Sequence, residues 1–165
     1  MFSFLQHQLD EKTVAECVRL AREEYARCWM DNTAPYPGVA ELLDALTQKR
    51  IPMTILSNKP DDFTKEMVAK LLPDWRFDIV QGALDDIPIK PDPAAALDIL
   101  SRLNVKPSEC LYLGDTNTDM KTAVNAGLYP IGALWGFRTK KELLENGAET
   151  LAKHPTDIIR ILDAS

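Results

Sequence analysis

The chain has 165 residues, of which 45% are apolar and 27% charged, and its formal net charge at pH 7 is −6. This length and composition are those of a single folded unit with a substantial core, and they exclude wholesale disorder. The negative charge argues against a broad nucleic-acid-binding surface, which needs clustered Lys and Arg side chains, but a small anion could still be held by a local cation.

Cysteine content and hydropathy bear on where the protein resides. The three cysteines, Cys17, Cys28 and Cys110, form no CxxC pair, which favours a reducing, cytoplasmic location. No apolar stretch approaches the roughly 20 residues that a membrane helix needs, so no membrane contact is expected. The first ten residues, MFSFLQHQLD, lack the positive and long apolar regions of a signal peptide.

Two helices are predicted before residue 50. Asp10 could cap the first, over residues 11–30, because apolar side chains recur there on one helical face and charged side chains on the other. This amphipathic pattern predicts a helix that packs on something. A stretch rich in Pro and Gly follows, and then a second helix with apolar side chains at Val39, Leu42, Leu43 and Leu46.

From Pro52 onward, short β-type runs alternate with amphipathic helices. The β-type runs are 53-MTILS-57, 77-FDIV-80, 110-CLYLG-114 and 129-YPIGAL-134. The helix candidates lie near residues 61–72, 93–103, 118–126, 139–146 and 156–163, with Gly127 and Gly147 as C-terminal stops. The alternation predicts an α/β fold with a parallel sheet and helices on both faces, and in such sheets ligands bind beyond the carboxyl ends of the strands.

Polar side chains follow three of these strands. Ser57 and Asn58 end the first run, Lys90 lies in the loop 88-PIKPDP-93 after the second, and Asp115 and Asp119 lie in 114-GDTNTDM-120 after the third. We therefore expect a hydroxyl, a lysine and two carboxylates to converge at one sheet edge. This set suits the handling of a phosphoryl group beside a divalent cation.

Each of these residues has a role in that chemistry. Asp115 could give an oxygen directly to Mg²⁺, and Asp119 could bind a metal-bound water or the lysine. Lys90 would offset the charges of the carboxylates and the phosphate, while the Ser57 hydroxyl and the Asn58 backbone N–H could donate to phosphoryl oxygens.

Taken singly, the same residues have structural explanations. Asp119 could cap a helix, Ser57 and Asn58 could form only a turn, and Lys90 could be a solvated charge. The order and strand placement of all three motifs together favour the functional interpretation.

The combination resembles a known family. The segments 56-LSNKP-60, 89-IKPDP-93 and 114-GDTNTDM-120 resemble motifs two, three and four of the haloacid dehalogenase superfamily of aspartate-dependent phosphohydrolases. The segments 37-PGVAELLDAL-46, 123-AVNAG-127 and 135-WGF-137 sharpen the resemblance toward the phosphoglycolate phosphatase-like branch. The resemblance implies a Rossmann-like core from about Pro35 to the C-terminus.

The resemblance also implies roles for these residues. Ser57 would bind the phosphoryl group, Lys90 would hold the nucleophile and the phosphate, and Asp115 would bind Mg²⁺ with Asp119 as an outer support. The first 30 residues resemble the closing helix of the family's helical cap. We therefore expect residues 1–34 to be a remnant of that cap and residues 35–165 to be the core.

One family motif is absent. Family catalysis starts from an N-terminal DxDGT motif that supplies the nucleophile and the general acid-base, and no Asp-x-Asp occurs in these 165 residues. The resemblance therefore implies a core that lacks its first, central strand. The strands ending at Ser57 and Gly114 must then pair directly, accept a strand from elsewhere, or leave exposed edges. The run Phe2-Ser3-Phe4-Leu5 is a local candidate, although a frayed or helix-packed terminus is the simpler explanation.

The resemblance implies a phosphatase that acts on small phosphomonoesters such as 2-phosphoglycolate, through a Mg²⁺-assisted aspartyl-phosphate mechanism. The chain would be an N-terminally truncated and inactive form of it. Dehalogenases do not need the metal-binding Gly-Asp pair, and phosphomutases usually show Glu-Asp where this chain has Gly114 and Asp115, so both are disfavoured. The alternatives are a catalytically dead module for binding or assembly, and a fragment completed by a separate chain, as a homodimer or through strand exchange.

Overall fold

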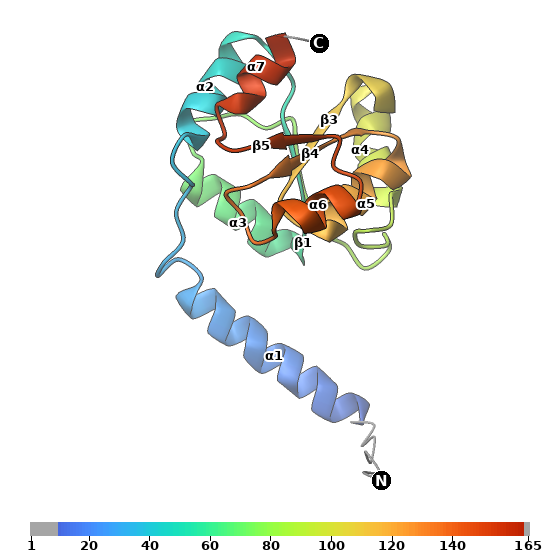
Figure 1. The fold of residues 1–165 in the computed structure, drawn as a ribbon. Helices are drawn as coiled ribbons and strands as arrows, with labels where there is room; N and C mark the ends of the chain where they lie inside the picture. Colours follow the sequence, from blue (N-terminus) through green and yellow to red (C-terminus); the bar gives the residue numbers. More distant parts are fainter. Residues whose placement is uncertain (1–9, 164–165) are drawn as a thin grey trace. The chain divides into compact units, whose positions relative to one another are not determined.

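In the computed structural model, residues 10–163 are described. The chain divides into two compact units, Met1–Ala34 and Pro35–Ser165 (Figure 1). The single unit expected from the chain length is therefore not what the structure shows, since the division gives two. The expected cap-like character of residues 1–34 stays a prediction, and the run Phe2–Leu5 lies outside the described residues.

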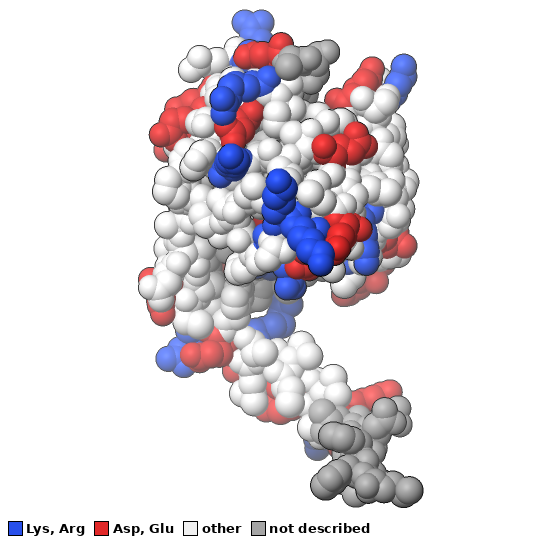
Figure 2. Space-filling model, in the orientation of Figure 1, with Lys and Arg blue, Asp and Glu red and all other residues white. Residues whose placement is uncertain are grey.

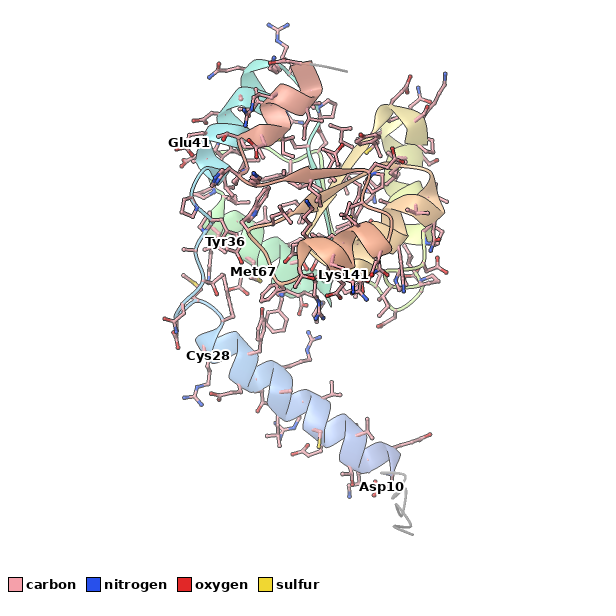
Figure 3. All side chains as sticks on the ribbon, in the orientation of Figure 1. Asp10, Cys28, Tyr36, Glu41, Met67 and Lys141 are labelled. Atoms are coloured by element: carbon pink, nitrogen blue, oxygen red, sulfur yellow. The ribbon has the colours of Figure 1, made fainter. Side chains whose placement is uncertain are left out.

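Helix α1 (Glu11–Cys28) dominates the first unit, and Figure 3 labels Asp10 and Cys28 near its two ends. The predicted cap is confirmed, because Oδ1 of Asp10 accepts a hydrogen bond of 2.8 Å from the backbone N–H of Thr13. Ion pairs one turn apart join Arg19 to Glu16 and to Glu23 on its polar face. No residue of α1 is buried, so cap and charge pairs are the contacts that support this helix locally.

The second unit alternates helices and strands along the chain (Figure 1). Its elements are α2 (Val39–Gln48), β1 (Thr54–Pro60), α3 (Asp61–Leu71), β2 (Ile79–Ala83), α4 (Ala94–Leu103), a short 3₁₀ helix (Pro107–Glu109), β3 (Leu111–Gly114), α5 (Asn117–Ala126), β4 (Tyr129–Ala133), α6 (Lys140–Glu145), β5 (Thr150–Ala152) and α7 (Asp157–Asp163). The predicted helices and strands are all present, with ends that differ by a few residues.

The strand pairings within residues 10–163 are all parallel, which confirms the predicted α/β class. Strands β1 and β2 pair with Leu56 opposite Gln81, and strands β3, β4 and β5 form a second ladder with Gly114 opposite Gly132. Strand β5 was not expected from the sequence. Three residues are too few for a hydrophobic period, and pairing with β4 gives this segment its strand conformation.

The core that supports the site lies between helices and strands of both ladders. One buried cluster joins α4 and α5 through Ala96, Leu100 and Ala123, and both Leu56 of β1 and Tyr112 of β3 pack against it. A second cluster ties α2 and α7 to the strands β4 and β5 through Leu42, Ile158, Ile131 and Ala152. The first cluster therefore places the carboxyl ends of β1 and β3 in the same region.

Strands β1 and β3 have open edges among the described residues. Among residues 10–163, β1 pairs only with β2, and β3 pairs only with β4. The side chain of Leu113 in β3 is 40% exposed, whereas strands of parallel sheets are usually buried on both faces. Direct pairing of the strands that end near Ser57 and at Gly114, one of the three expected outcomes, is thus not adopted by the described residues, and their unpaired backbone groups can accept another strand.

Charged side chains of both signs are interspersed on the face drawn in Figure 2. Ion pairs on the second unit join Arg138 to Glu142 and Lys141 to Glu145, each one helical turn apart. The residues visible on that face therefore form a mixed surface rather than a continuous basic one.

A carboxylate ties the end of β1 to β2 and makes the fold sensitive to acid. Asp61 accepts hydrogen bonds from Lys65 at 2.6 Å and from the backbone N–H of Gly82 at 2.9 Å. The bond from Lys65, followed by that from Gly82, lowers the pKa of Asp61. A lowered pKa in the folded state adds stability above the ordinary pKa of the group, and this stability is lost as the pH falls through the lowered value.

We therefore expect Asp61→Asn to lower the free energy of unfolding at neutral pH by about 1 kcal/mol. The difference from the parent should shrink as the pH falls through the lowered pKa of Asp61, because the carboxyl group is then protonated in the folded as well as the unfolded state. Urea denaturation at several pH values measures this. An equal loss at every pH would mean that the ionised carboxylate is not the stabilising species.

Candidate functional site

Ser57 and Asn58 lie where β1 becomes irregular. The register of β1 against β2 shifts between Leu56 and Pro60, which leaves the intervening residues outside the regular ladder. The Ser57 hydroxyl oxygen accepts a hydrogen bond of 3.1 Å from the backbone N–H of Lys59. This contact accords with the turn expected at these residues and leaves the hydroxyl proton available for another acceptor.

Lys90 is the centre of the site. Its ammonium group donates to Oδ1 of Asp119 at 2.7 Å and to the backbone carbonyl of Leu56 at 3.1 Å. The side chains of Lys90 and Asp119 are only 11% and 9% exposed. The structural alternative of a solvated lysine is therefore wrong: this is a nearly buried ion pair that links the end of β1 to the start of α5.

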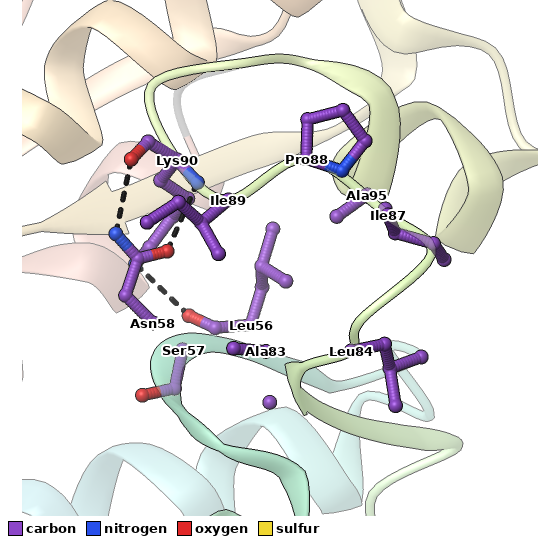
Figure 4. Close-up of a pocket in the computed structure, with 11 residues that line it drawn as sticks. Leu56, Ser57, Asn58, Ala83, Leu84, Ile87, Pro88, Ile89, Lys90 and Ala95 are labelled. Atoms are coloured by element: carbon purple, nitrogen blue, oxygen red, sulfur yellow. Dashed lines mark hydrogen bonds between the residues drawn. The ribbon is translucent and has the colours of Figure 1, made fainter. Parts of the chain in front are cut away.

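The side chain of Asn58 holds the backbone of Lys90. Its Nδ2 donates to the Lys90 carbonyl at 3.0 Å, and its Oδ1 accepts from the Lys90 N–H at 2.9 Å (Figure 4). The sequence predicted a role for the Asn58 backbone N–H in phosphate binding, and it gave no sign of this paired contact. The side chain of Asn58 is thus a positioning group for Lys90.

Asp119 combines the two roles that the sequence left open. Thr116 is the N-cap of α5, and Oδ2 of Asp119 accepts from its backbone N–H at 3.1 Å and its hydroxyl at 2.6 Å. The Asp119 N–H in turn donates to the Thr116 hydroxyl at 3.2 Å. One oxygen of Asp119 thus caps the helix and the other faces Lys90, an arrangement that suits a supporting role beside a metal rather than direct ligation.

Asp115 directly follows β3 and has a different partner from this pair. Its Oδ2 accepts a hydrogen bond of 2.9 Å from the backbone N–H of Phe137, and no other described residue donates to its carboxylate. The remaining oxygen, Oδ1, fits a Mg²⁺ ion, which takes one or two carboxylates and completes its shell with water and phosphate oxygens. Among residues 10–163 no cluster of three or more His, Cys, Asp or Glu side chains that could hold a metal is found, so Asp115 would contribute to a partial site.

An open pocket adjoins these groups. It is a shallow pocket open to solvent, and Ser57, Asn58 and Lys90 line it together with the apolar side chains Leu84, Ile87 and Ile89 (Figure 4). Residues with a hydroxyl, an amide and an ammonium group therefore line the same pocket beside apolar side chains. Ser57, Asn58 and Lys90 share this pocket and Lys90 pairs with Asp119, while Asp115 is bound by the backbone N–H of Phe137.

Two further titratable groups lie near the site: Tyr112 in β3, and Cys110 directly before this strand. Burial raises the pKa of the Cys110 thiol. Burial, and then the negative charge of Asp119, raises the pKa of Tyr112 well above its usual range. Both groups therefore stay protonated at neutral pH, and neither is suited to serve as an anionic nucleophile.

The fold and these motifs match known proteins. A family model described as haloacid dehalogenase-like hydrolase matches residues 3–127. The chain belongs to the haloacid dehalogenase-like hydrolase family. This confirms the family resemblance that the three motifs predicted.

Similar members of the haloacid dehalogenase-like family include phosphoglycolate phosphatases. The chain is 28% identical to that of Aquifex aeolicus over 98% of its own length and 74% of the relative's, and 30% identical to that of Escherichia coli over 78% and 52%. A crystal structure of a candidate phosphoglycolate phosphatase from Lactobacillus delbrueckii superposes with a TM-score of 0.84 at 28% identity, covering 93% of this chain and 64% of that one. The chain therefore spans between about half and three quarters of the length of these relatives.

Proposed function

We propose that the protein is a phosphatase of the haloacid dehalogenase superfamily that hydrolyses small phosphomonoesters such as 2-phosphoglycolate. The observation that carries this proposal is the nearly buried pair of Lys90 and Asp119 beside the pocket of Ser57 and Asn58. A desolvated ammonium group and a hydroxyl that line the same pocket are suitable hydrogen-bond donors to a phosphate dianion. The names of the similar phosphatases support the same substrate class.

In this proposal each residue acts at a stated atom. The Lys90 ammonium group and the Ser57 hydroxyl donate to phosphoryl oxygens, and Oδ1 of Asp115 contributes to a Mg²⁺ site. Bound Mg²⁺ would neutralise charge on the phosphoryl group. Asp119 holds Lys90 in place, and Asn58 fixes the backbone that carries it.

The family mechanism also needs an aspartate nucleophile. These 165 residues contain no Asp-x-Asp, so in the proposed aspartyl-phosphate mechanism that nucleophile is supplied by a segment outside them. The open edges of β1 and β3 support a segment that enters as a strand, from the same polypeptide, from a second copy by strand exchange, or from a separate chain. On this basis the 165 residues alone are expected to be inactive.

The test compares binding with turnover. With Mg²⁺ present, inorganic phosphate should shift the NMR signals of Ser57, Asn58 and Lys90 in the 165-residue protein, and Lys90→Met should abolish these shifts. The same protein should hydrolyse p-nitrophenyl phosphate and 2-phosphoglycolate no faster than buffer, whereas a version preceded by a strand with Asp-x-Asp should hydrolyse them. A folded extended version without hydrolysis of any phosphomonoester would refute the proposal.

The second candidate is a catalytically dead relative that serves as a binding or assembly module. The absence of Asp-x-Asp and the open strand edges favour it. Metal-dependent hydrolysis by the 165-residue protein would overturn this candidate. Phosphate-induced shifts without turnover in any extended form would support it.

The proposal extends to the binding partner and the cellular location of the protein. The partner is a small phosphorylated metabolite, and the mixed charges in Figure 2 support the expectation that nucleic acid is not one. Among residues 10–163 no helix is both long and apolar enough to cross a bilayer. A cytoplasmic location is supported by three cysteines that form no disulfide.

A further inference from the structure

Residues 135–137, which follow β4, lie close to the carboxylate of Asp115. Strands β3 and β4 are parallel neighbours with Gly114 opposite Gly132, so the segments that follow them leave the sheet at the same edge. At that edge the backbone N–H of Phe137 donates to Oδ2 of Asp115 at 2.9 Å. A backbone N–H that donates to a carboxylate makes a charge-assisted hydrogen bond, which fixes the rotation of the carboxyl group as well as binding it.

Gly136 makes this approach sterically feasible. A Cβ atom added there would lie 2.2 Å from Cβ and 2.3 Å from Oδ2 of Asp115, closer than atoms can pack. The contact involves the short and well-fixed side chain of Asp115 rather than the end of a long flexible one. Glycine is thus required at this position by the closeness of Asp115.

The segment is anchored on its other side by the core. Leu134 donates its backbone N–H to the carbonyl of Ala152 in β5 at 2.9 Å. Trp135 packs against the cluster that contains Ile131, Ala152 and Ile158. In contrast, Phe137 is 84% exposed, so the residue contributes through its backbone N–H rather than through packing of its side chain.

We infer that residues 135–137 form a positioning clamp that leaves a single oxygen of Asp115 for the metal ion. With Oδ2 occupied by the Phe137 N–H, Oδ1 is the oxygen directed to a cation, and Asp115 acts as a ligand through one oxygen. The inference rests on the proposed function, since it concerns the Mg²⁺ site of that function. The clamp gives each residue of 135-WGF-137 a role. Trp135 anchors the segment in the core, Gly136 leaves room for the carboxylate, and Phe137 donates its backbone N–H.

The test uses a matched pair of variants at one exposed position. Phe137→Pro removes the backbone N–H, whereas Phe137→Ala removes the ring and keeps the N–H. Gly136→Ala is a second disruptive variant that leaves the N–H in place but displaces the carboxylate. Metal affinity is read from the broadening of amide NMR signals around Asp115 during a Mn²⁺ titration, and the state of the carboxylate from the ¹³C signal of its carboxyl carbon without metal.

We expect Phe137→Pro and Gly136→Ala to shift the Asp115 carboxyl signal and to weaken Mn²⁺ binding by about 10-fold or more, while Phe137→Ala behaves as the parent. A carboxyl signal that is the same in all variants would overturn the clamp, whether or not the metal binds. Failure of the parent itself to bind Mn²⁺ would refute the metal site of the proposed function, while a shifted carboxyl signal would still support the hydrogen bond that forms the clamp. If Phe137→Pro does not fold, Gly136→Ala with Phe137→Ala decides the question.

Discussion

Replacing Lys90 by methionine should lower the free energy of unfolding by about 3–5 kcal/mol, because it leaves the Asp119 carboxylate buried without its cation. The two side chains are 11% and 9% exposed and are joined at 2.7 Å. Methionine has a similar length, so lost packing contributes little. The Leu56 carbonyl loses a donor as well. Urea denaturation followed by the near-ultraviolet circular dichroism of the second unit measures the loss.

A double-variant cycle separates the ion pair from other effects. Asp119→Asn removes the charge of the partner and should also destabilise, because the ammonium group of Lys90 is then unpaired. If the pair itself is responsible, the double variant should be more stable than the sum of the single losses predicts, by about 1–3 kcal/mol. Strict additivity would show that Lys90 and Asp119 contribute separately, and would contradict the assigned pair. Lys70→Met is the matched control, since Lys70 pairs with Glu66 on the surface and should change stability by less than about 1 kcal/mol.

Gly114→Ala should be a strongly damaging substitution at the site, although it adds only one methyl group. The added Cβ would lie 2.2 Å from Cβ and 2.7 Å from Cγ of Asp119. Because Asp119 is held on one side by Thr116 and on the other by Lys90, it cannot move away without breaking one of these contacts. We expect a loss of about 1–3 kcal/mol in the free energy of unfolding, together with lost phosphate-induced shifts at Lys90.

Gly132→Ala provides the comparison for this prediction. Gly132 lies opposite Gly114 in the parallel ladder. Its added Cβ would meet mainly the ends of the flexible side chains of Leu151 and Leu143, at 2.8 Å and 3.1 Å. These can shift, so the loss should be smaller and the phosphate-induced shifts should persist. Equal effects of the two substitutions would mean that a general intolerance of side chains in these strands, rather than crowding of Asp119, explains Gly114.

Local patterns in the sequence predicted most of the fold. Asp10 caps α1 and Gly127 ends α5 in a left-handed conformation, both of which follow from the chemistry of single residues. The parallel arrangement followed from the alternation of strands and helices. Strand β5 escaped prediction because three residues gain their conformation from pairing with β4, which is a contact at long range along the chain.

The sequence likewise indicated some features of the candidate site and not others. The motifs indicated Ser57, Lys90, Asp115 and Asp119, since a hydroxyl, a lysine and carboxylates at strand ends are recognisable by residue type. The side-chain contact of Asn58 with the Lys90 backbone and the contact of Phe137 with Asp115 were not indicated. Both depend on backbone groups, which every residue carries and no sequence pattern distinguishes.

The sequence by itself determined the family, the parallel α/β class and the residues at the strand ends, because these follow from residue types and their spacing along the chain. Only the tertiary structure decided which groups meet. It paired Lys90 with Asp119, directed Phe137 to Asp115 and left β1 and β3 unpaired with each other among the described residues. Such contacts depend on the angles at which separate elements pack, and distances of a few ångströms between them are set by the whole core rather than by any local stretch of sequence.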